Sequence, residues 1–129
     1  MLNKERSVKF FERVWNERDE NALSGFLHPD VTAYFEGGVI CKGMEEVRAW
    51  MHDVLKAMPD LHFDVIDVIE EDPKVVVRWR ATATVGGQTE MVQGMTWFLH
   101  RGDAIVEGGD CWNKGALDAK LERAAATAA

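Results

Sequence analysis

A single carboxylate near the end of the chain stands among residues that suit acid–base chemistry. Asp110 lies in the sequence Gly108-Gly109-Asp110-Cys111-Trp112, on the last of the predicted strands. The two glycines would let a ligand approach the strand closely. A carboxylate that faces an apolar cavity has its ionised form destabilised, so its pKa rises toward neutrality, where it can exchange protons with a carbon acid. The alternative is an exposed aspartate at a strand end.

Other polar side chains suggest fewer reactions. Tyr34 could donate a hydrogen bond to a ligand carbonyl, or it could be a core tyrosine with a satisfied hydroxyl. His62 and Asp64 would place two metal ligands on one side of a strand, but no third ligand is evident. His100 ends its predicted strand and is expected to be exposed.

No metal site and no cofactor are therefore expected. The glycine pairs 37–38 and 86–87 lie in predicted hairpins rather than at helix starts, so they do not form a phosphate-binding loop. Cys41 and Cys111 lack metal-type spacing and are expected to be free thiols in a reducing compartment.

The elements that must position these residues follow from hydrophobic periodicity. Apolar positions at helical spacing predict helices over residues 3–18 and 44–58, with a short helix around residues 22–27 between them. Alternating patterns predict strands at 31–35, 39–41, 61–70, 74–85, 89–101 and 104–112. Helices followed by an antiparallel meander indicate an α+β fold, with three N-terminal helices on one face of a curved sheet that leaves a hydrophobic cavity. The chain is expected to be one domain over residues 1–129, with a tail from 116 that begins helical and frays.

The aromatic and methionine side chains are the best sequence evidence for that cavity. The chain has five tryptophans and six methionines. Flat apolar walls and adaptable filler suit a flat apolar ligand, although most of these residues are expected to be ordinary core. The members assigned to inward stripes are Trp15, Trp50, Met51, Met58, Trp79, Met91, Met95 and Trp97.

The opposite face of the sheet is too apolar for bare solvent and too polar for a core. A symmetric homodimer through this outer face is the natural expectation. Its assigned members are Ile66, Val68, Val76, Arg78, Arg80, Thr82, Val92 and Phe98.

The composition excludes several classes of partner. The net charge of −7 over 129 residues argues against nucleic acid and against an anionic membrane surface, because both need clustered Lys and Arg. No apolar run is long enough to span a membrane, and the charged N-terminus lacks the apolar stretch of a signal peptide. We expect a cytoplasmic protein whose partner is a small hydrophobic molecule.

Several segments together resemble the SnoaL-like polyketide cyclase branch of the NTF2-like superfamily. The resemblance spans about residues 5 to 118 and implies the cystatin-like cone of that superfamily. It rests on residues 14–19 (VWNERD), 27–31 (LHPDV), 42–47 (KGMEEV), 58–63 (MPDLHF), 75–80 (VVVRWR) and 103–107 (DAIVE).

The resemblance also implies positions for catalytic groups. Related cyclases and epoxide hydrolases carry an acid–base residue where Asp110 stands. Ketosteroid isomerase, in the same superfamily, has its base near Glu36, although a solvated turn glutamate beside two glycines is the simpler interpretation. The hydrogen-bond donors of that isomerase fall at Phe11 and at Met95 or Thr96, so a donor to an enolate is missing. The Arg-x-Asp pair of the epoxide hydrolases is replaced by Trp79 and Ala81.

Three functions remain open from the sequence. The first is a cofactor-independent cyclase or isomerase that acts by proton transfer on a small hydrophobic cyclic ketone, with Asp110, and with Glu36 as a second candidate. Its substrate would contact Tyr34, Trp15, Trp50, Trp79, Met95 and Trp97. The second is a non-catalytic module that binds a small hydrophobic ligand. The third is a dimeric interaction protein whose cavity is filled by its own side chains.

Overall fold

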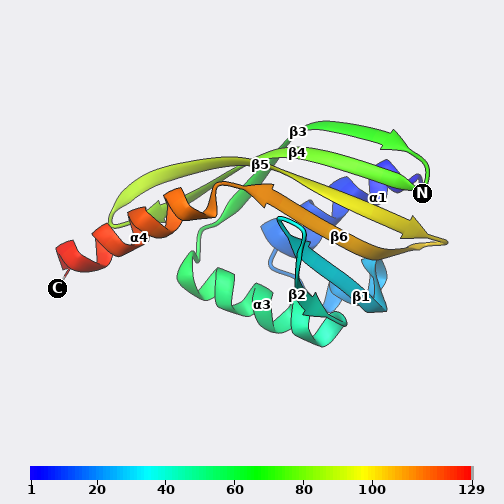
Figure 1. Cartoon of the computed structure of the whole chain (residues 1–129), viewed down its shortest axis with the longest axis horizontal. Helices are drawn as coiled ribbons and strands as arrows, with labels where there is room; N and C mark the ends of the chain where they lie inside the picture. The colour runs from blue at the N-terminus through cyan, green and yellow to red at the C-terminus, as the bar shows by residue number, and fades with distance from the viewer. Residues whose placement is uncertain (129) are drawn as a thin grey trace.

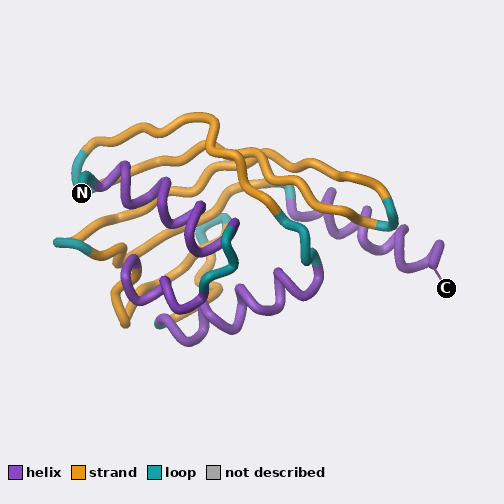
Figure 2. Tube along the Cα trace, turned by 180° about the vertical axis from the view of Figure 1, so that it is seen from behind, coloured by secondary structure: helices purple, strands orange, loops and turns teal. Residues whose placement is uncertain are grey.

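The chain forms one curved sheet with helices packed on its concave side (Figures 1 and 2). The structure is a computed structural model and describes residues 1–128, of which 120, 121 and 124–128 are described by their backbone alone. The predicted α+β architecture is confirmed. In chain order the elements are α1 (Asn3–Lys9), η1 (Phe10–Asn16), η2 (Glu20–Ala22), α2 (Leu23–Phe26), β1 (Leu27–Phe35), β2 (Gly38–Lys42), α3 (Met44–Ala57), β3 (His62–Glu71), β4 (Lys74–Val85), β5 (Gln88–Arg101), β6 (Ala104–Trp112) and α4 (Lys114–Ala128).

The six strands make one mixed sheet in the order β2-β1-β6-β5-β4-β3. Neighbouring strands run antiparallel except β1 and β6, which pair in parallel. This pairing places the end of β1 beside the end of β6, where Phe35 lies opposite Asp110. The last strand therefore lies in the middle of the sheet. α2, which precedes β1, contacts it, and α3, which follows β2, packs on β1 and β2.

The first helix changes geometry where it reaches the core. The predicted helix over 3–18 is α-helical to Lys9 and continues as the π-helical segment η1 to Asn16. π-Helical turns are rare and frequently occur at functional sites. Here the wider turn buries four side chains of η1, and all four line the cavity described below: Phe10, Phe11, Val14 and Trp15.

The end of this helix is fixed to the start of β3 by side chains. The Asn16 amide donates to the Phe63 carbonyl oxygen at 2.9 Å and accepts from the Phe63 N–H at 2.8 Å. The Arg18 guanidinium donates to the carbonyl oxygens of Pro59 and Leu61 at 2.9 and 2.6 Å. These bonds hold the aromatic face of η1 against the sheet.

The facing of β4 agrees with the predicted alternation, whereas that of β5 is the reverse of the prediction. Trp79 and Ala81 of β4 lie directly opposite Gly94 and Val92, and residues opposite each other in a sheet share a face. The even-numbered residues of β5 therefore face the helices. Met91 and Met95, which were predicted to face inward, are 46% and 50% exposed on the outer face.

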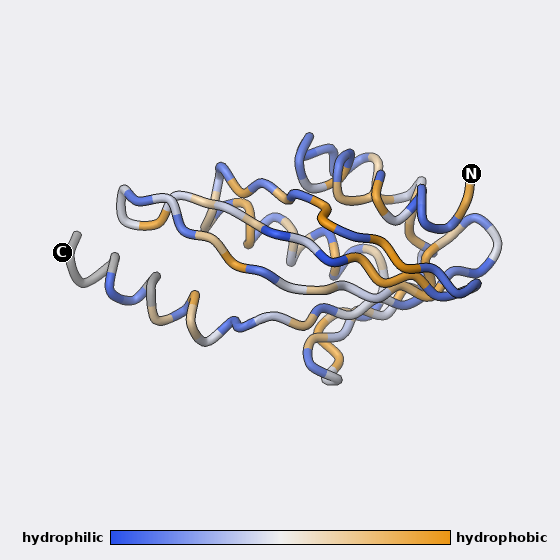
Figure 3. The backbone as a smooth tube through the Cα atoms, turned by 90° about the horizontal axis from the view of Figure 1, so that it is seen from above, coloured by the Kyte–Doolittle hydropathy of each residue, from blue (hydrophilic) through white to orange (hydrophobic). Residues whose placement is uncertain are grey.

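The prediction of which residues lie on the outer face is wrong for three apolar residues. Phe98 is buried in the core, and Val68 and Val92 pack against it. For Val92 and Phe98 the error arose because both faces of β5 carry large apolar side chains, so hydrophobicity alone cannot fix its orientation. Val68 lies on β3, after a shift in the pairing register between Val65 and Asp67. Figure 3 shows how hydrophobic and hydrophilic residues follow one another along the chain.

On the outer face, two aromatic rings meet across a glycine. Tyr34 of β1 and Trp97 of β5 both lie opposite Gly109 of β6. Their rings stack with centroids 5.7 Å apart and planes at 28°. A Cβ built on Gly109 would lie 2.3 Å from Nε1 of Trp97, so only glycine leaves room for this indole.

A buried polar cluster closes the far end of the sheet and corrects the prediction that His100 is exposed. His100 is 3% exposed, with Nε2 2.9 Å from Oγ of Ser7 and Nδ1 3.4 Å from the Arg6 guanidinium. Arg6 can only donate, so Nδ1 accepts and Nε2 carries the proton that is donated to Ser7. Ser7 in turn donates to the carbonyl oxygen of Asn3 at 3.0 Å. This tautomer cannot remove a proton from Ser7, so the pair is structural.

The C-terminal helix α4 leaves the sheet at the end of β6 and runs alongside the β4–β5 hairpin (Figures 1 and 2). It begins at Lys114, two residues before the predicted tail. The predicted fraying concerns the end of the tail, and residue 129 lies outside the described residues. Within the described chain, no helix combines the length and the apolar character needed to cross a membrane.

Acid should weaken the fold through His100. Burial, and then the charge of Arg6, lower the pKa of His100 to about 4 from an ordinary value of 6.5. The unfolded state therefore gains a proton below pH 6.5 that the folded state refuses until about pH 4, so stability falls across this window as pH falls. The stability difference between wild type and His100→Gln should change by about 3 kcal/mol between pH 7 and pH 4. Urea unfolding at both pH values measures it. A difference that is constant with pH would contradict the buried neutral histidine.

Gly109→Ala should destabilise the fold by about 1–3 kcal/mol, because the new methyl group collides with the Trp97 indole. Gly25→Ala is the matched control, since a Cβ at Gly25 meets no atom within 4 Å. Thermal unfolding of both variants checks the prediction. In a Trp97→Ala background the cost of Gly109→Ala should largely disappear, and an unchanged cost would place the strain elsewhere.

Candidate active site

A cavity of about 490 Å³ lies between the concave face of the sheet and the helices η1, α2 and α3. Its size is within the range of small-molecule sites, and its walls are overwhelmingly apolar. α3 contributes the inward stripe Val47, Trp50, Met51 and Val54, at the spacing that the sequence predicts. The aromatic residues of the lining are Phe10, Phe11, Trp15, Tyr34, Phe35, Trp50, Phe63, Trp79, Phe98 and Trp112.

Aromatic contacts run across the cavity wall from helix to sheet. Trp15 meets Trp50 of α3 edge-to-face at 5.5 Å, and it also contacts Phe63 at 5.6 Å. Phe63 meets Trp79 edge-to-face at 5.1 Å, and Trp79 meets Trp112 at 6.5 Å. These rings give the cavity flat and rigid walls.

Asp110 of β6 lines this cavity, and its carboxyl has one hydrogen-bond donor among the described side chains. Thr96, directly opposite on β5, donates its hydroxyl to Oδ1 of Asp110 at 2.6 Å. The Trp79 indole N–H donates to the same hydroxyl oxygen at 2.9 Å. Asp110, Thr96 and Trp79 are thus joined in one row across three neighbouring strands.

The environment of Asp110 disfavours its charge. Burial among apolar side chains raises the pKa of Asp110 to about 6 from an ordinary value of 3.8, and the hydrogen bond from Thr96 opposes part of that rise. A carboxyl with a pKa near 6 is present in both protonation states close to neutrality. It can therefore serve as a base or as an acid.

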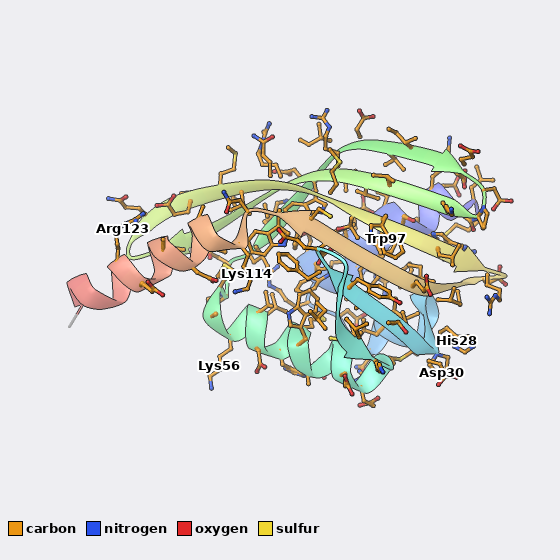
Figure 4. The ribbon with its side chains drawn as sticks, viewed as in Figure 1. His28, Asp30, Lys56, Trp97, Lys114 and Arg123 are labelled. Carbon is orange, nitrogen blue, oxygen red and sulfur yellow. The ribbon has the colours of Figure 1, made fainter. Side chains whose placement is uncertain are left out.

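Charged side chains lie at the rim of the cavity rather than inside it. The exposed residues Asp53 of α3 and Lys114 of α4 border the lining, as do Glu90 and Asp118. Lys114 forms an ion pair with Asp118 at 2.6 Å. Figure 4 shows Lys114 at the start of α4. Among the described lining residues it carries the one positive charge.

The residues singled out from the sequence divide into two groups. Asp110, Trp15, Trp50 and Trp79 line the cavity together. Met95 lies on the outer face, and so does Trp97, whose ring covers Gly109 there. Their predicted inward orientation is wrong, for the reason given for β5.

Tyr34 and Glu36 both lie near Asp110 through the pairing of β1 with β6, but only Tyr34 is among the residues that line the cavity. Tyr34 borders the lining, while its ring is stacked on Trp97 in the outer row. Glu36 is exposed in the turn between β1 and β2 with a φ of 49°. Its backbone N–H donates to the carbonyl oxygen of Asp110 at 3.2 Å, but its side chain is not among the described lining residues.

Sequence reasoning missed Thr96, the one side chain that hydrogen-bonds to Asp110. The residue was counted as a place where a donor is missing, yet its hydroxyl donates to the carboxyl. Gly94, two residues before Thr96, was the available signal for the orientation of β5. A glycine opposite Trp79 leaves room for the indole, and Thr96 lies on the same face as Gly94. A Cβ on Gly94 would lie 2.7 Å from the Trp79 ring.

No group of three or more His, Cys, Asp or Glu side chains within residues 1–128 is placed to hold a metal ion. Cys41 is buried and Cys111 is exposed, and both are free thiols. The chemistry that the described lining can perform is proton transfer at Asp110 in an apolar enclosure.

Comparison with known structures supports the fold. A proposed SnoaL-like polyketide cyclase from Jannaschia sp. CCS1 superposes with a TM-score of 0.83 at 21% identity, over 92% of this chain and 90% of that one. AclR, a proposed hydroxylase from Streptomyces galilaeus, gives 0.81 at 23% identity, over 94% and 96%. IdmH, a proposed polyketide cyclase from Streptomyces antibioticus, gives 0.84 at 16% identity, over 95% and 99%. No curated protein matches the chain.

At these identities the solved structures establish the fold and leave the activity open. The family follows from the sequence match, which extends from the first helix into β6. The model of the SnoaL-like domain matches residues 8–108, most of the chain, and this protein therefore belongs to the SnoaL-like domain family of the NTF2-like superfamily.

Proposed function

We propose that the protein is a cofactor-independent cyclase or isomerase that acts by proton transfer on a small hydrophobic cyclic ketone. The observation that carries this proposal is Asp110, a carboxyl with a pKa near 6 in the wall of an otherwise apolar cavity. Membership of the SnoaL-like family and the likeness to proposed polyketide cyclases support the same reaction class.

In the proposed reaction, ionised Asp110 removes a proton from the carbon next to the ketone of the substrate. The electron pair of the broken C–H bond moves into an enolate. In an isomerase the protonated carboxyl returns the proton to another carbon. In a cyclase the enolate carbon attacks a second carbonyl of the same molecule, and the protonated carboxyl then supplies the proton to the new alkoxide. Either course returns Asp110 to its starting state.

The charges around the cavity favour a neutral substrate. Asp110 is the ionisable group in the wall, while Asp53, Glu90 and Asp118 add acidic groups at the rim. Lys114, the one cation of the described lining, is already paired with Asp118. A substrate carboxylate would enter a low-dielectric site without a counter-charge, which is costly.

A binding module without catalysis is the second candidate. One observation favours it: Thr96, the polar side chain nearest to Asp110, donates to that carboxyl instead of pointing a donor at a ligand carbonyl. The Thr96 hydroxyl is then not free to stabilise a developing enolate. An interaction protein with a filled cavity is less favoured, because a volume of about 490 Å³ remains.

We also propose that two copies associate through the outer face of the sheet. This face exposes four large apolar side chains: Ile66, Ile69, Met91 and Met95, with exposed fractions of 41–65%. A patch of this kind on a sheet is typical of an interface between subunits. Tyr34 and Trp97, stacked on the same face, would extend it.

Asp110→Asn should reduce turnover by about a hundredfold or more, because the amide cannot exchange the proton. The wild-type kcat/KM should rise tenfold per pH unit below about 6 and level off above, if ionised Asp110 is the base. Steady-state kinetics on cyclic ketones measures both. Turnover retained by Asp110→Asn, with ligand binding unchanged, would reject catalysis by this residue and favour the binding module.

A neutral ligand should raise the unfolding temperature more than its acid analogue. Paired probes, such as the methyl ester and the free carboxylic acid of one aromatic ketone, should differ at pH 8 because only the acid carries a charge into the cavity. A thermal-shift titration with both measures this. Equal shifts would contradict the proposed preference for neutral substrates.

Met95→Glu should convert a dimer into a monomer, since the new charge would be buried in the apolar interface. Glu70→Gln, a change on an edge strand, serves as the control. Analytical ultracentrifugation of the wild type and both variants decides the matter. A monomeric wild type at concentrations of tens of micromolar would reject the proposed dimer.

A further inference from the structure

Hydrogen bonds join Trp79, Thr96 and Asp110 in a row, and the donor at the Trp79 end determines which group donates in each bond. Trp79 donates its indole N–H to Oγ1 of Thr96 at 2.9 Å, and Thr96 lies 2.6 Å from Oδ1 of Asp110. Trp79 and Thr96 are 3% and 5% exposed, so water does not compete freely for these groups. The indole N–H can only donate.

Because Trp79 donates, the oxygen of Thr96 is an acceptor in that bond. The single hydroxyl proton of Thr96 is then free to be donated to Asp110, and the 2.6 Å separation fits such a charge-assisted bond. Oδ1 of Asp110 therefore accepts a hydrogen bond whether the carboxyl is ionised or protonated. When Asp110 is protonated, its own proton must be on Oδ2.

Oδ2 is the oxygen that remains for a ligand. No residue in the part of the chain that the structure describes forms a hydrogen bond to Oδ2. Every buried polar side-chain atom there has a hydrogen-bond partner, so Oδ2, which has none, is not buried. It is open to the cavity that Asp110 lines. Phe35 and Trp112 lie on the same face of the sheet as Asp110 and meet edge-to-face at 5.8 Å. Phe35 has no side-chain donor, and the indole N–H of Trp112 forms no hydrogen bond to Oδ2 in the described structure.

We propose that Thr96 and Trp79 are positioning residues that make Oδ2 of Asp110 the proton-exchanging atom of the site. The inference rests on the proposed function, in which Asp110 is the acid–base group. Thr96 holds the carboxyl by Oδ1 in both protonation states, and Trp79 keeps the hydroxyl proton of Thr96 turned toward Asp110. The proton then enters and leaves on the side where a substrate lies.

The same row keeps the carboxyl usable near neutrality. Burial alone would favour the protonated form and raise the pKa of Asp110 further, whereas the bond from Thr96 favours the ionised form. Without this bond a larger share of the protein would hold Asp110 as an acid at neutral pH, and a base would be available less often.

The test uses the ligand-free protein, so it does not depend on a substrate. The pKa of Asp110 is measured by pH-difference infrared spectroscopy of the carboxyl bands, which are assigned by their loss in Asp110→Asn. Thr96→Val removes the hydroxyl at nearly constant shape and should raise the pKa by about one pH unit. Thr96→Ser is the matched control, because it keeps the hydroxyl and should stay close to wild type.

Trp79→Phe tests the direction of the row. Without the indole N–H, the hydroxyl of Thr96 can rotate and accept a hydrogen bond from Oδ1 when the carboxyl is protonated on that oxygen. The carbonyl band of protonated Asp110 should then split into two populations. In the wild type it should be a single band at the lower frequency of a hydrogen-bonded carbonyl.

The outcomes separate this proposal from the proposed function. An unchanged pKa of Asp110 in folded Thr96→Val overturns the positioning role. Should that variant fail to fold, a wild-type carbonyl band free of hydrogen bonding overturns it instead. With a substrate in hand, Thr96→Val should move the pH at which kcat/KM rises, and Thr96→Ser should not. If Asp110 proves not to be catalytic, the infrared results still hold, and only the proposed function is rejected.

Discussion

The site depends on the register in which β5 pairs with its two neighbours. Thr96 lies opposite Asp110 of β6 and opposite Val77 of β4, so both pairings place Thr96 on the sheet face that carries these two residues. A slip of one residue would turn every side chain of β5 to the other face. Met95 and Trp97 would then enter the cavity, and Asp110 would lose its hydrogen-bond donor. Gly94, beneath the Trp79 ring, helps to fix this register because a larger residue there would collide with it.

Two buried titratable groups have their charged forms disfavoured in this fold, with different consequences. His100 is kept neutral by burial and then by the charge of Arg6, and its cluster joins α1 to the end of β5. Asp110 is kept close to neutral by apolar walls, with only Thr96 to support its charge. The first arrangement satisfies every polar atom and stabilises the fold. The second leaves one oxygen open, which costs stability above its pKa but leaves the group reactive.

The elements whose facing follows from hydrophobic periodicity could be predicted from the sequence. The alternation of β4 is clean because its outward residues, such as Arg78 and Arg80, are charged. The helical stripe of α3 is equally clear, and the glycines before Asp110 marked the place of the carboxyl. β5 could not be oriented in this way, since Trp97 and Phe98 are both large aromatic residues and face opposite sides. Burial of His100 was also beyond prediction, because it depends on Arg6 and Ser7, more than ninety residues away.

The glycine beneath the Trp97 indole ties the outer surface of the sheet to the residue next to Asp110. Position 109 can hold a larger side chain only if position 97 holds a smaller one, so the two sites cannot change independently. Among relatives, a bulky residue at one position should accompany a small residue at the other. Selection on the outer surface would thereby restrict the strand that carries Asp110, and a family alignment should show positions 97 and 109 covarying even though Trp97 does not line the cavity.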